Sequence, residues 1–404
     1  MSLPADLADR HASSLIPTAM PSSRIALIDC TDGTGHHARY GAEVARALHE
    51  AGCPTVAIGP AGWCQAMAEH APGLPLDWRF PAGQGYRQRN QAFRQFCRLV
   101  IDTCRREGIT SAHFLYIDGF LSALLDTWNG HAPSVTATLH WYPFLSRGAA
   151  NAAGLKQWAK GRLTLYWMKQ LAHRGASFGV HAREAQRTLE SNDIGPVHFL
   201  PYPNFDNAIV RTVEARSTGR RVMGLQDDDR LFLCFGGTRH DKGCDLALQA
   251  LARTPTSCHL LIAGNANDFS RSMLERLSTD LGVQSRVHLD IRHIPDDELG
   301  LLFSSCDAVV LPYRHTFSGQ SGPLITAVSL GIPVVASRLK VFEETLDGHR
   351  SATLVSPEDV TTLAEALAHT ATVTNTQGAG TPGHTIDDLA RFRAGVRACH
   401  GCTT

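Results

Sequence analysis

The apolar and polar positions along this chain follow two patterns, short apolar runs and longer segments with helical spacing, which take turns along the sequence. Short apolar runs, such as 24–30 (RIALIDC) and 55–59 (TVAIG), are followed by longer segments whose apolar residues repeat at helical spacing. Strands that alternate with helices in this way indicate parallel pairing, with helices on both faces of the sheet. In the first part of the chain we expect strands at 24–30, 55–59, 112–117, 135–140, 176–181 and 197–202, and helices at 38–51, 91–108 and 155–174.

A polar, turn-rich stretch at 206–229, which contains VEARSTGRR and QDDD, interrupts this pattern. We interpret it as the connection between two domains, because the alternation of strands and helices restarts after it. In the second part we expect strands at 231–235, 259–264, 287–290, 308–313 and 333–337, helices at 245–253, 270–281, 296–305, 323–330, 360–371 and 386–399, and a flexible segment at 372–385.

The predicted architecture is therefore α/β, with two doubly wound domains back to back. We expect an N-terminal domain at 1–210 and a C-terminal domain at 211–385. Ligands of open parallel sheets bind at the carboxyl ends of the strands, so the two sheets should enclose a cleft between these edges.

Charge and cysteine content narrow the function classes. The 404 residues carry 38 Lys and Arg against 38 Asp and Glu, so the net formal charge is zero. Such a chain offers no global field for nucleic acid, and any cationic site must be local. The eleven cysteines, scattered through apolar runs, indicate buried thiols in a reducing compartment. Cys399 and Cys402 have metal-like spacing but no second pair, so we expect no metal site.

The location of the protein is expected to be cytoplasmic. The segment 1–23 is not basic and has too short an apolar run for a signal peptide, and no 18 uncharged apolar residues occur together. The predicted helices 91–108 and 155–174 combine basic and aromatic residues that could lie on an anionic bilayer. With a net charge of zero, a solvated basic face is the favoured interpretation, and peripheral membrane contact is the alternative.

The segment FGGTRHDKG at 235–243 is the clearest candidate site. A strand stops at Gly236 and Gly237, Arg239 and Lys242 follow, and a helix begins at Asp245. Glycines let backbone N–H groups approach a ligand, and a helix N-terminus with two cations stabilises negative charge. The pattern predicts a diphosphate site, while an ordinary strand–turn–helix connection with solvated basic residues remains open.

Two further edges belong to the first predicted sheet. The loop TDGTGHHARY places Gly33 and Gly35 between strand and helix, but it is not GxGxxG and no acidic residue ends the next strand. It favours close backbone approach to a substrate over a nicotinamide cofactor, and His36 and His37 either bond a polar ligand or cap the helix.

His140 ends a strand before aromatic residues, where it could bond a sugar hydroxyl or simply pack in the loop.

A third edge is glycine-rich. The strand that ends near Pro312 leads through the loop 318–322 (SGQSG) into a helix that starts at Pro323, and proline suits the first turn of a helix. Free backbone N–H groups should again face the cleft. Two such edges in one domain support a phosphate site more strongly than either does alone.

Taken in order, GTRHDKG, DLALQA, LLIAG, RVHL with IPDDEL, CDAVVLPYR and the QSG loop before AVSLGIPVVAS resemble family 4 (group 1) glycosyltransferases of the GT-B fold. The resemblance covers about residues 230–370, and GTGHHARY, TLH, GVHAREA and LPYPNFD add weaker matches in the first half. It implies two Rossmann-like domains that face each other across a cleft, a nucleotide-sugar donor on the C-terminal domain and an acceptor on the N-terminal one. It also implies that the final helix, 386–399, crosses back onto the first domain.

Residue roles follow from the resemblance position by position. Arg239 and Lys242 match the family's cations on the donor diphosphate, and His140 matches the histidine near the transferred sugar. Ile294 matches the position where the backbone meets the nucleotide base. The remaining matches are Gly33 and Gly35 in the loop near phosphates and acceptor, and Ser318, Gly319, Gln320, Ser321 and Gly322 in the loop that touches sugar and phosphate.

One departure concerns two glutamates that the family carries eight positions apart, on the sugar and the ribose. These positions are Ser318 and Thr326 here, which puts ribose binding by a carboxylate and the donor identity in doubt. The QSG loop with the short R-x-x-K-G spacing resembles a variant of the family.

The sequence therefore predicts a retaining, metal-independent transfer of a hexosyl group from a nucleotide-diphosphate sugar, expected to be a UDP-sugar, to a hydroxyl of a small molecule or glycan. No cofactor is expected to be bound permanently. The loops offer no carboxylate pair of the kind that glycosidases use, which argues against hydrolysis. Two alternatives stay open, which are another GT-B enzyme such as a nucleotide-sugar epimerase and a non-catalytic partner protein that keeps the fold.

Overall fold

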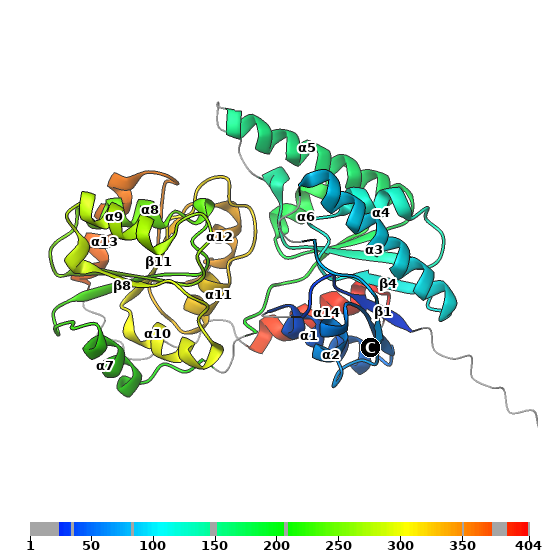
Figure 1. Ribbon diagram of the computed structural model, residues 1–404, viewed down its shortest axis with the longest axis horizontal. Helices are drawn as coiled ribbons and strands as arrows, with labels where there is room; N and C mark the ends of the chain where they lie inside the picture. The colour runs from blue at the N-terminus through cyan, green and yellow to red at the C-terminus, as the bar shows by residue number, and fades with distance from the viewer. Residues whose placement is uncertain are drawn as a thin grey trace, which may run out of the picture.

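The computed structural model describes residues 24–33, 36–81, 85–145, 152–205, 209–349, 351–373 and 386–402. In these residues the chain builds two parallel sheets, each covered by helices on both faces (Figure 1). This confirms the expected α/β architecture of two Rossmann-like halves. No helix of the described residues combines the length and the apolar character that a membrane span needs.

The N-terminal half holds a seven-stranded sheet in the order β3-β2-β1-β4-β5-β6-β7. Strands β1 and β2 are buried along their whole length, and β5 in all but its first residue, because helices cover both faces. The elements are β1 Ile25–Ile28, α1 His36–Glu50, β2 Thr55–Gly59, α2 Ala61–Ala66, β3 Gly73–Pro75, α3 Tyr86–Arg106, β4 Ser111–Phe114, α4 Leu121–Thr127, β5 Ser134–Leu139, η1 Pro143–Leu145, α5 Ala152–His173, β6 Ser177–Val180, α6 Arg183–Glu190 and β7 Val197–Phe199.

The C-terminal half holds a six-stranded sheet in the order β10-β9-β8-β11-β12-β13. In both sheets the strand order reverses beside the first strand, between β1 and β4 and between β8 and β11, and ligands bind at such switch points. The elements are α7 Val213–Val222, β8 Arg230–Phe235, η2 His240–Lys242, α8 Cys244–Leu251, β9 Cys258–Ala263, α9 Arg271–Asp280, η3 Gln284–Arg286, β10 Val287–Asp290, η4 Asp296–Glu298, α10 Leu299–Ser305, β11 Ala308–Leu311, α11 Gly322–Ser329, β12 Val334–Ser337, α12 Lys340–Thr345, β13 Ala352–Val355, α13 Val360–Thr372 and α14 Ile386–Cys399.

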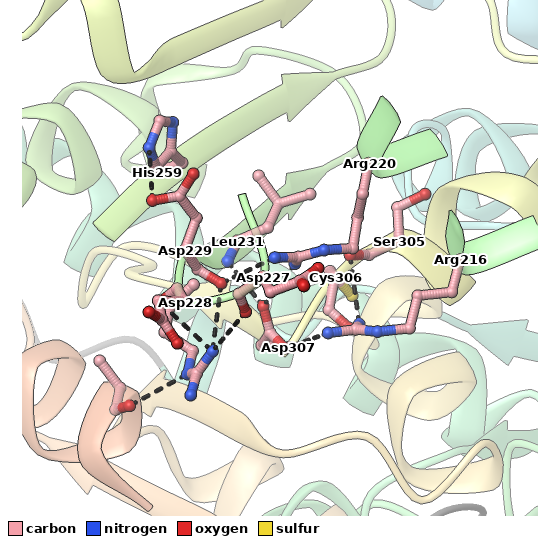
Figure 2. A network of polar contacts seen from close by, with 12 residues as sticks. Arg216, Arg220, Asp227, Asp228, Asp229, Leu231, His259, Ser305, Cys306 and Asp307 are labelled. Carbon is pink, nitrogen blue, oxygen red and sulfur yellow. Dashed lines mark hydrogen bonds and ion pairs between the residues drawn. The ribbon is translucent and has the colours of Figure 1, made fainter. Parts of the chain in front are cut away.

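The stretch 206–229 is not only a connection, as we had interpreted it from the sequence. It contains helix α7, which packs against α10. Figure 2 shows the reason: Arg216 and Arg220 of α7 both bind the carboxylate of Asp307, at 2.6 and 3.1 Å. The same carboxylate accepts the backbone N–H of Leu231 at the start of β8, at 2.7 Å. This ion-pair network fixes α7 to the edge of the second sheet opposite the carboxyl ends of its strands.

The final helix crosses back to the N-terminal half, as the sequence led us to expect. Helix α14 lies beside α1 in the N-terminal half, although the C-terminal half precedes it in the chain (Figure 1). Phe392 and Val396 are fully buried in the N-terminal core, and Arg393 binds Glu43 and Glu50 of α1. The expected flexible segment lies almost wholly outside the described residues.

Candidate active site

The loop after β8 carries the two predicted cations. It is tightly folded, since Gly236 and Gly243 have φ angles of 115° and 67° that other residues rarely adopt. A Cβ atom at Gly236 would lie 2.6 Å from the Nζ atom of Lys242, so this glycine makes room for the ammonium group. Gly237 follows at the same turn, and Asn267 packs against it.

The two cations differ in their partners. The guanidinium of Arg239 binds the carboxylate of Asp241 through two bonds, at 2.9 and 2.6 Å, and this carboxylate raises the pKa of Arg239 although burial opposes it. Lys242 forms no ion pair within the described part of the chain. Burial, with a smaller effect of Arg239, lowers the pKa of Lys242 to about 8. A buried cation without a counter-ion fits a site for an anion.

Arg239 faces the cleft, while Lys242 lies beside Tyr313 within its own half. The Arg239 guanidinium lies 5.9 Å from the ring centre of Trp141, a residue of the N-terminal half, and 6.0 Å from that of Phe317. The ammonium of Lys242 lies 5.7 Å from the ring centre of Tyr313. The loop after β8, the loop before α11 and the end of β5 therefore meet at one place.

The glycine-rich loop before α11 joins the two halves. Gly319 forms an antiparallel bridge with Trp141, and the carbonyl of Ser318 accepts the N–H of Tyr142 at 2.9 Å. The amide of Gln320 donates to the carbonyl of His181 at 2.8 Å. The hydroxyl of Ser318 is buried without a partner in the described structure, so it is a polar group that a ligand could satisfy.

Ser321 and Gly322 start α11 as the sequence suggested. The Ser321 hydroxyl caps the helix by accepting the N–H of Leu324 at 3.4 Å. A Cβ atom at Gly322 would meet nothing within 4 Å, so the first turn of α11 opens on free space. Thr326 lies one turn further and is only 4% exposed, and Ile294 is buried with its side chain in the core.

His140 lies at the end of β5 in a cluster of rings. Its ring stacks on that of Tyr116, with the ring centres 3.9 Å apart, and its ring centre lies 4.5 Å from that of His181. The Nε2 atom bonds the carbonyl of Leu115 at 3.0 Å, and because a carbonyl only accepts, Nε2 carries the proton. Burial and the charge of His181 hold the pKa of His140 well below its ordinary value. A neutral ring with a free lone pair on Nδ1 can accept a bond from a hydroxyl.

Asp118, which the sequence analysis missed, holds the end of β5 in place. Its buried carboxylate accepts the backbone N–H groups of His140, at 3.0 and 3.1 Å, and of Trp141, at 2.8 Å. Burial raises the pKa of Asp118 to about 6, although these hydrogen bonds oppose the shift. An acidic residue just after the predicted strand 112–117 was the available signal.

Asp29, also missed, organises the first loop. It is 1% exposed and binds His37 Nδ1 at 2.7 Å, while its other oxygen accepts the N–H and hydroxyl of Thr31, both at 2.7 Å. His37 therefore has a carboxylate partner at the start of α1, and neither predicted role is tested by it. Gly33 has a φ of 72° and packs against α2, and Gly35 lies outside the described residues.

Residues that could hold a metal do not gather in the described part of the chain, where no group of three or more His, Cys, Asp or Glu side chains is arranged as a ligand set. The described site instead combines cations and N–H donors at the switch point of the second sheet with a ring cluster at the edge of the first.

Comparison with known proteins finds a family match in the C-terminal half, which carries the two cations. The sequence model of the family described as glycosyl transferases group 1 matches residues 229–372. A relative, the D-inositol 3-phosphate glycosyltransferase of Mycobacterium tuberculosis, is 27% identical over 191 residues, which are 46% of this chain. The chain spans only 38% of the length of that relative.

Solved structures resemble the whole chain. Sucrose-phosphate synthase from Thermosynechococcus elongatus has a TM-score of 0.70 at 17% identity and covers 93% of this chain and 94% of its own. Anabaena HepE in complex with UDP-glucose has a TM-score of 0.62 at 16% identity and covers 93% of both chains. At these identities the likeness shows the fold.

The fold is thus that of the GT-B proteins, with two Rossmann-like halves that meet at a cleft. Within it, residues 229–372 match the sequence model of the group 1 glycosyl transferases, and a curated glycosyltransferase is similar to 46% of the chain.

Proposed function

We propose that this protein is a retaining glycosyltransferase that moves a hexosyl group from a nucleotide-diphosphate sugar to an acceptor hydroxyl, without a metal ion. The observation that carries the proposal is the pair Arg239 and Lys242. Both lie at the switch point of the matched domain, and Arg239 faces the opposite half across the cleft.

The leaving group explains why cations are needed. A diphosphate gains charge as its bond to the sugar breaks, and preorganised donors at that position lower the barrier. Arg239, Lys242 and the N–H groups at the start of α11 would supply this stabilisation, with Gly237 and the loop 318–322 in contact with the donor. Ile294 would place the base, and Thr326 stands near the ribose in place of a carboxylate.

The acceptor hydroxyl is proposed to attack on the face that the diphosphate leaves. The departing phosphate oxygen then takes the proton of that hydroxyl, which gives retention of configuration. His140 would accept a bond from a hydroxyl of the transferred sugar through Nδ1, because its Nε2–H is engaged with Leu115. Gly33 and Gly35 would let the first loop approach the acceptor.

The expected donor is a UDP-sugar, which the UDP-glucose bound to HepE supports. Residues 1–210 with the final helix would hold the acceptor, a small molecule or glycan, and 211–385 the donor. The eleven free thiols support a reducing compartment such as the cytoplasm. The match to a transferase family does not favour an epimerase or a non-catalytic partner.

The test is a thermal-shift panel of UDP-, GDP- and ADP-sugars followed by turnover with candidate acceptors and NMR of the product anomer. Stabilisation by a UDP-sugar and a product with the donor's anomeric configuration are expected. An inverted product would overturn the retaining mechanism, and binding of nucleotide without turnover across the panel would favour the non-catalytic alternative. Conversion of the donor with no acceptor present would favour an epimerase.

A further inference from the structure

A second group of cations faces the cleft from the N-terminal half. The ammonium of Lys160, in the third turn of α5, lies 4.2 Å from the ring centre of Trp141. This is the same ring that Arg239 approaches from the C-terminal half. The first turns of α3 and α5 lie on the side of the N-terminal half that faces the C-terminal half (Figure 1).

These cations are not balanced by acidic partners. Burial lowers the pKa of Lys160, Arg89 and Lys156 add to the effect, and only Asp118 opposes them. Asp118 forms no ion pair with Lys160 in the described structure, and both its oxygens accept backbone N–H groups. None of Lys160, Lys156 and Arg89 forms an ion pair with a described carboxylate, so three positive charges stand at one edge of the cleft.

The indole adds a hydrogen-bond donor without an acceptor. The Nε1 atom of Trp141 is buried and has no partner in the described structure. An indole N–H can only donate, and a buried donor left unpaired costs about 1–3 kcal/mol. Cations together with an unpaired N–H match an oxygen-rich anion.

We propose that Lys160 and Trp141, with Lys156 and Arg89, form a subsite that binds an anionic group, a phosphate or a carboxylate, on the acceptor. The inference rests on the proposed function and specifies its acceptor class. The donor diphosphate already has Arg239 and Lys242 on the other half, and the N-terminal half is where the acceptor is expected. Lys160 and Trp141 act here as specificity residues.

Direct binding tests the subsite without turnover. Inorganic phosphate is titrated into the full chain carrying Arg239→Ala and Lys242→Ala, so that the donor-side cations do not contribute, and binding is followed by phosphorus NMR. Adding Lys160→Ala should weaken binding at least tenfold. The matched control is Lys169→Ala on the same helix, whose ammonium binds Asp193, and it should change nothing. Equal phosphate binding with and without Lys160 would overturn the proposal.

Kinetics then identifies the substrate that carries the charge. Lys160→Ala should raise KM for a phosphorylated sugar acceptor at least tenfold, leave KM for the unphosphorylated sugar within twofold, and leave donor KM unchanged. Trp141→Phe, which keeps the ring and removes the N–H, should give a smaller rise in the same KM. A comparison of UDP-glucose with UDP-glucuronate tests the other source, and a rise in KM confined to UDP-glucuronate would overturn the acceptor assignment.

The two proposals fail in different ways. Phosphate binding that depends on Lys160, together with no turnover of any nucleotide-sugar, would support the subsite and sink the transferase function. Normal turnover of an anionic acceptor by Lys160→Ala would support the transferase function and overturn the subsite.

Discussion

At the scale of single residues, the two donor-side cations should not contribute in the same way. Arg239 is held by Asp241 before any ligand arrives, so its position is fixed but its charge is partly offset. Lys242 is buried without such a partner, so it has more to gain from an anion. Charge that is already desolvated and in place needs little reorganisation during the reaction.

Removal of either cation should therefore slow the transfer. Losing one preorganised group at a charged transition state costs ~3 kcal/mol, or about a hundredfold. We expect Arg239→Ala and Lys242→Ala each to lower kcat at least tenfold on a nucleotide-sugar donor, measured by release of the nucleotide diphosphate. Arg271→Ala, an exposed arginine paired with Glu275 on α9, serves as the control and should retain full activity. Unchanged kinetics in the first two variants would remove the diphosphate assignment.

The lowered pKa of Lys242 gives a pH dependence with a defined sign. The pKa falls from its ordinary value to about 8 mainly because burial disfavours the charged form. Above about pH 8 the free protein loses this charge, so UDP should bind more weakly as pH rises from 7 to 9. Lys242→Arg stays charged and should flatten the profile, which also corrects for titration of UDP itself. Isothermal titration calorimetry at fixed ionic strength measures the affinity for UDP at each pH. Parallel affinity profiles of the parent protein and Lys242→Arg would contradict the prediction.

The same shift predicts a change in stability. Because the folded pKa of Lys242 is lower than the unfolded one, folding carries a cost that is present below about pH 8. This cost in folding free energy becomes smaller as the pH rises from about 8 toward the ordinary pKa of a lysine side chain. In chemical denaturation, the free energy of unfolding of Lys242→Met should therefore change less with pH than that of the parent protein.

Sequence reasoning found the cations but not the residues that hold the site together. Arg239 and Lys242 stand in one short motif, and the structure turns Arg239 toward the cleft and Lys242 toward Tyr313. Asp118 acts on His140 and Trp141 across two strands, 22 and 23 residues along the chain. Such a contact depends on the pairing of β4 with β5, which no local pattern reports.

At the scale of elements, buried strands were predicted well and short surface helices were not. The run at 55–59 is β2 to the residue, because a strand covered on both faces must be apolar throughout. The short helices α2, α4, α6 and α12 were missed, since a segment of six to eight residues shows too little periodicity, and so were the shorter strands β3 and β13. Residues 206–229 were misread because the ion pairs that stabilise α7 make the segment polar.

The ion pairs of α7 should matter for stability. Arg220 and Asp307 expose only 10% and 19% of their side chains, and Asp307 serves two arginines and a backbone N–H. Removal of one member of a buried pair leaves an uncompensated charge, which costs about 3–5 kcal/mol. We expect Asp307→Ala to lower the free energy of unfolding by about 3 kcal/mol in urea denaturation. Asp280→Ala, at an exposed position of α9, is the control, and equal midpoints for the two variants would contradict the prediction.

At the scale of the whole molecule, polar contacts between described residues join the two halves. The loop before α11 bonds Tyr142 and His181, and Arg39 of α1 binds Asp296. The chain also crosses between the halves twice, once before α7 and once before α14 (Figure 1). Polar contacts and two crossings suit a cleft that opens and closes around its substrates.

The most specific of these contacts is made by Glu344 of α12. Its carboxylate accepts the N–H groups of Arg183 and Glu184 in α6, at 2.8 and 2.7 Å, while Ala182 at the N-cap has no side chain to do so. A cap contributes about 1 kcal/mol, and here one half caps a helix of the other. In this arrangement the two N–H groups of α6 have their acceptor in the opposite half.

Glu344→Ala should therefore favour the open arrangement. A loss of 1–2 kcal/mol changes the ratio of closed to open molecules about five- to thirtyfold. We expect a larger radius of gyration in X-ray scattering without ligand and a rise in donor KM of at least threefold, with kcat nearly restored at saturating donor because binding energy then drives closure. The control is Glu343→Ala on the same helix, whose carboxylate binds Arg338 and Lys340 of its own half and should leave both measurements unchanged. If Glu344→Ala scatters like the parent and binds donor equally well, the cap stabilises α6 alone and takes no part in closure.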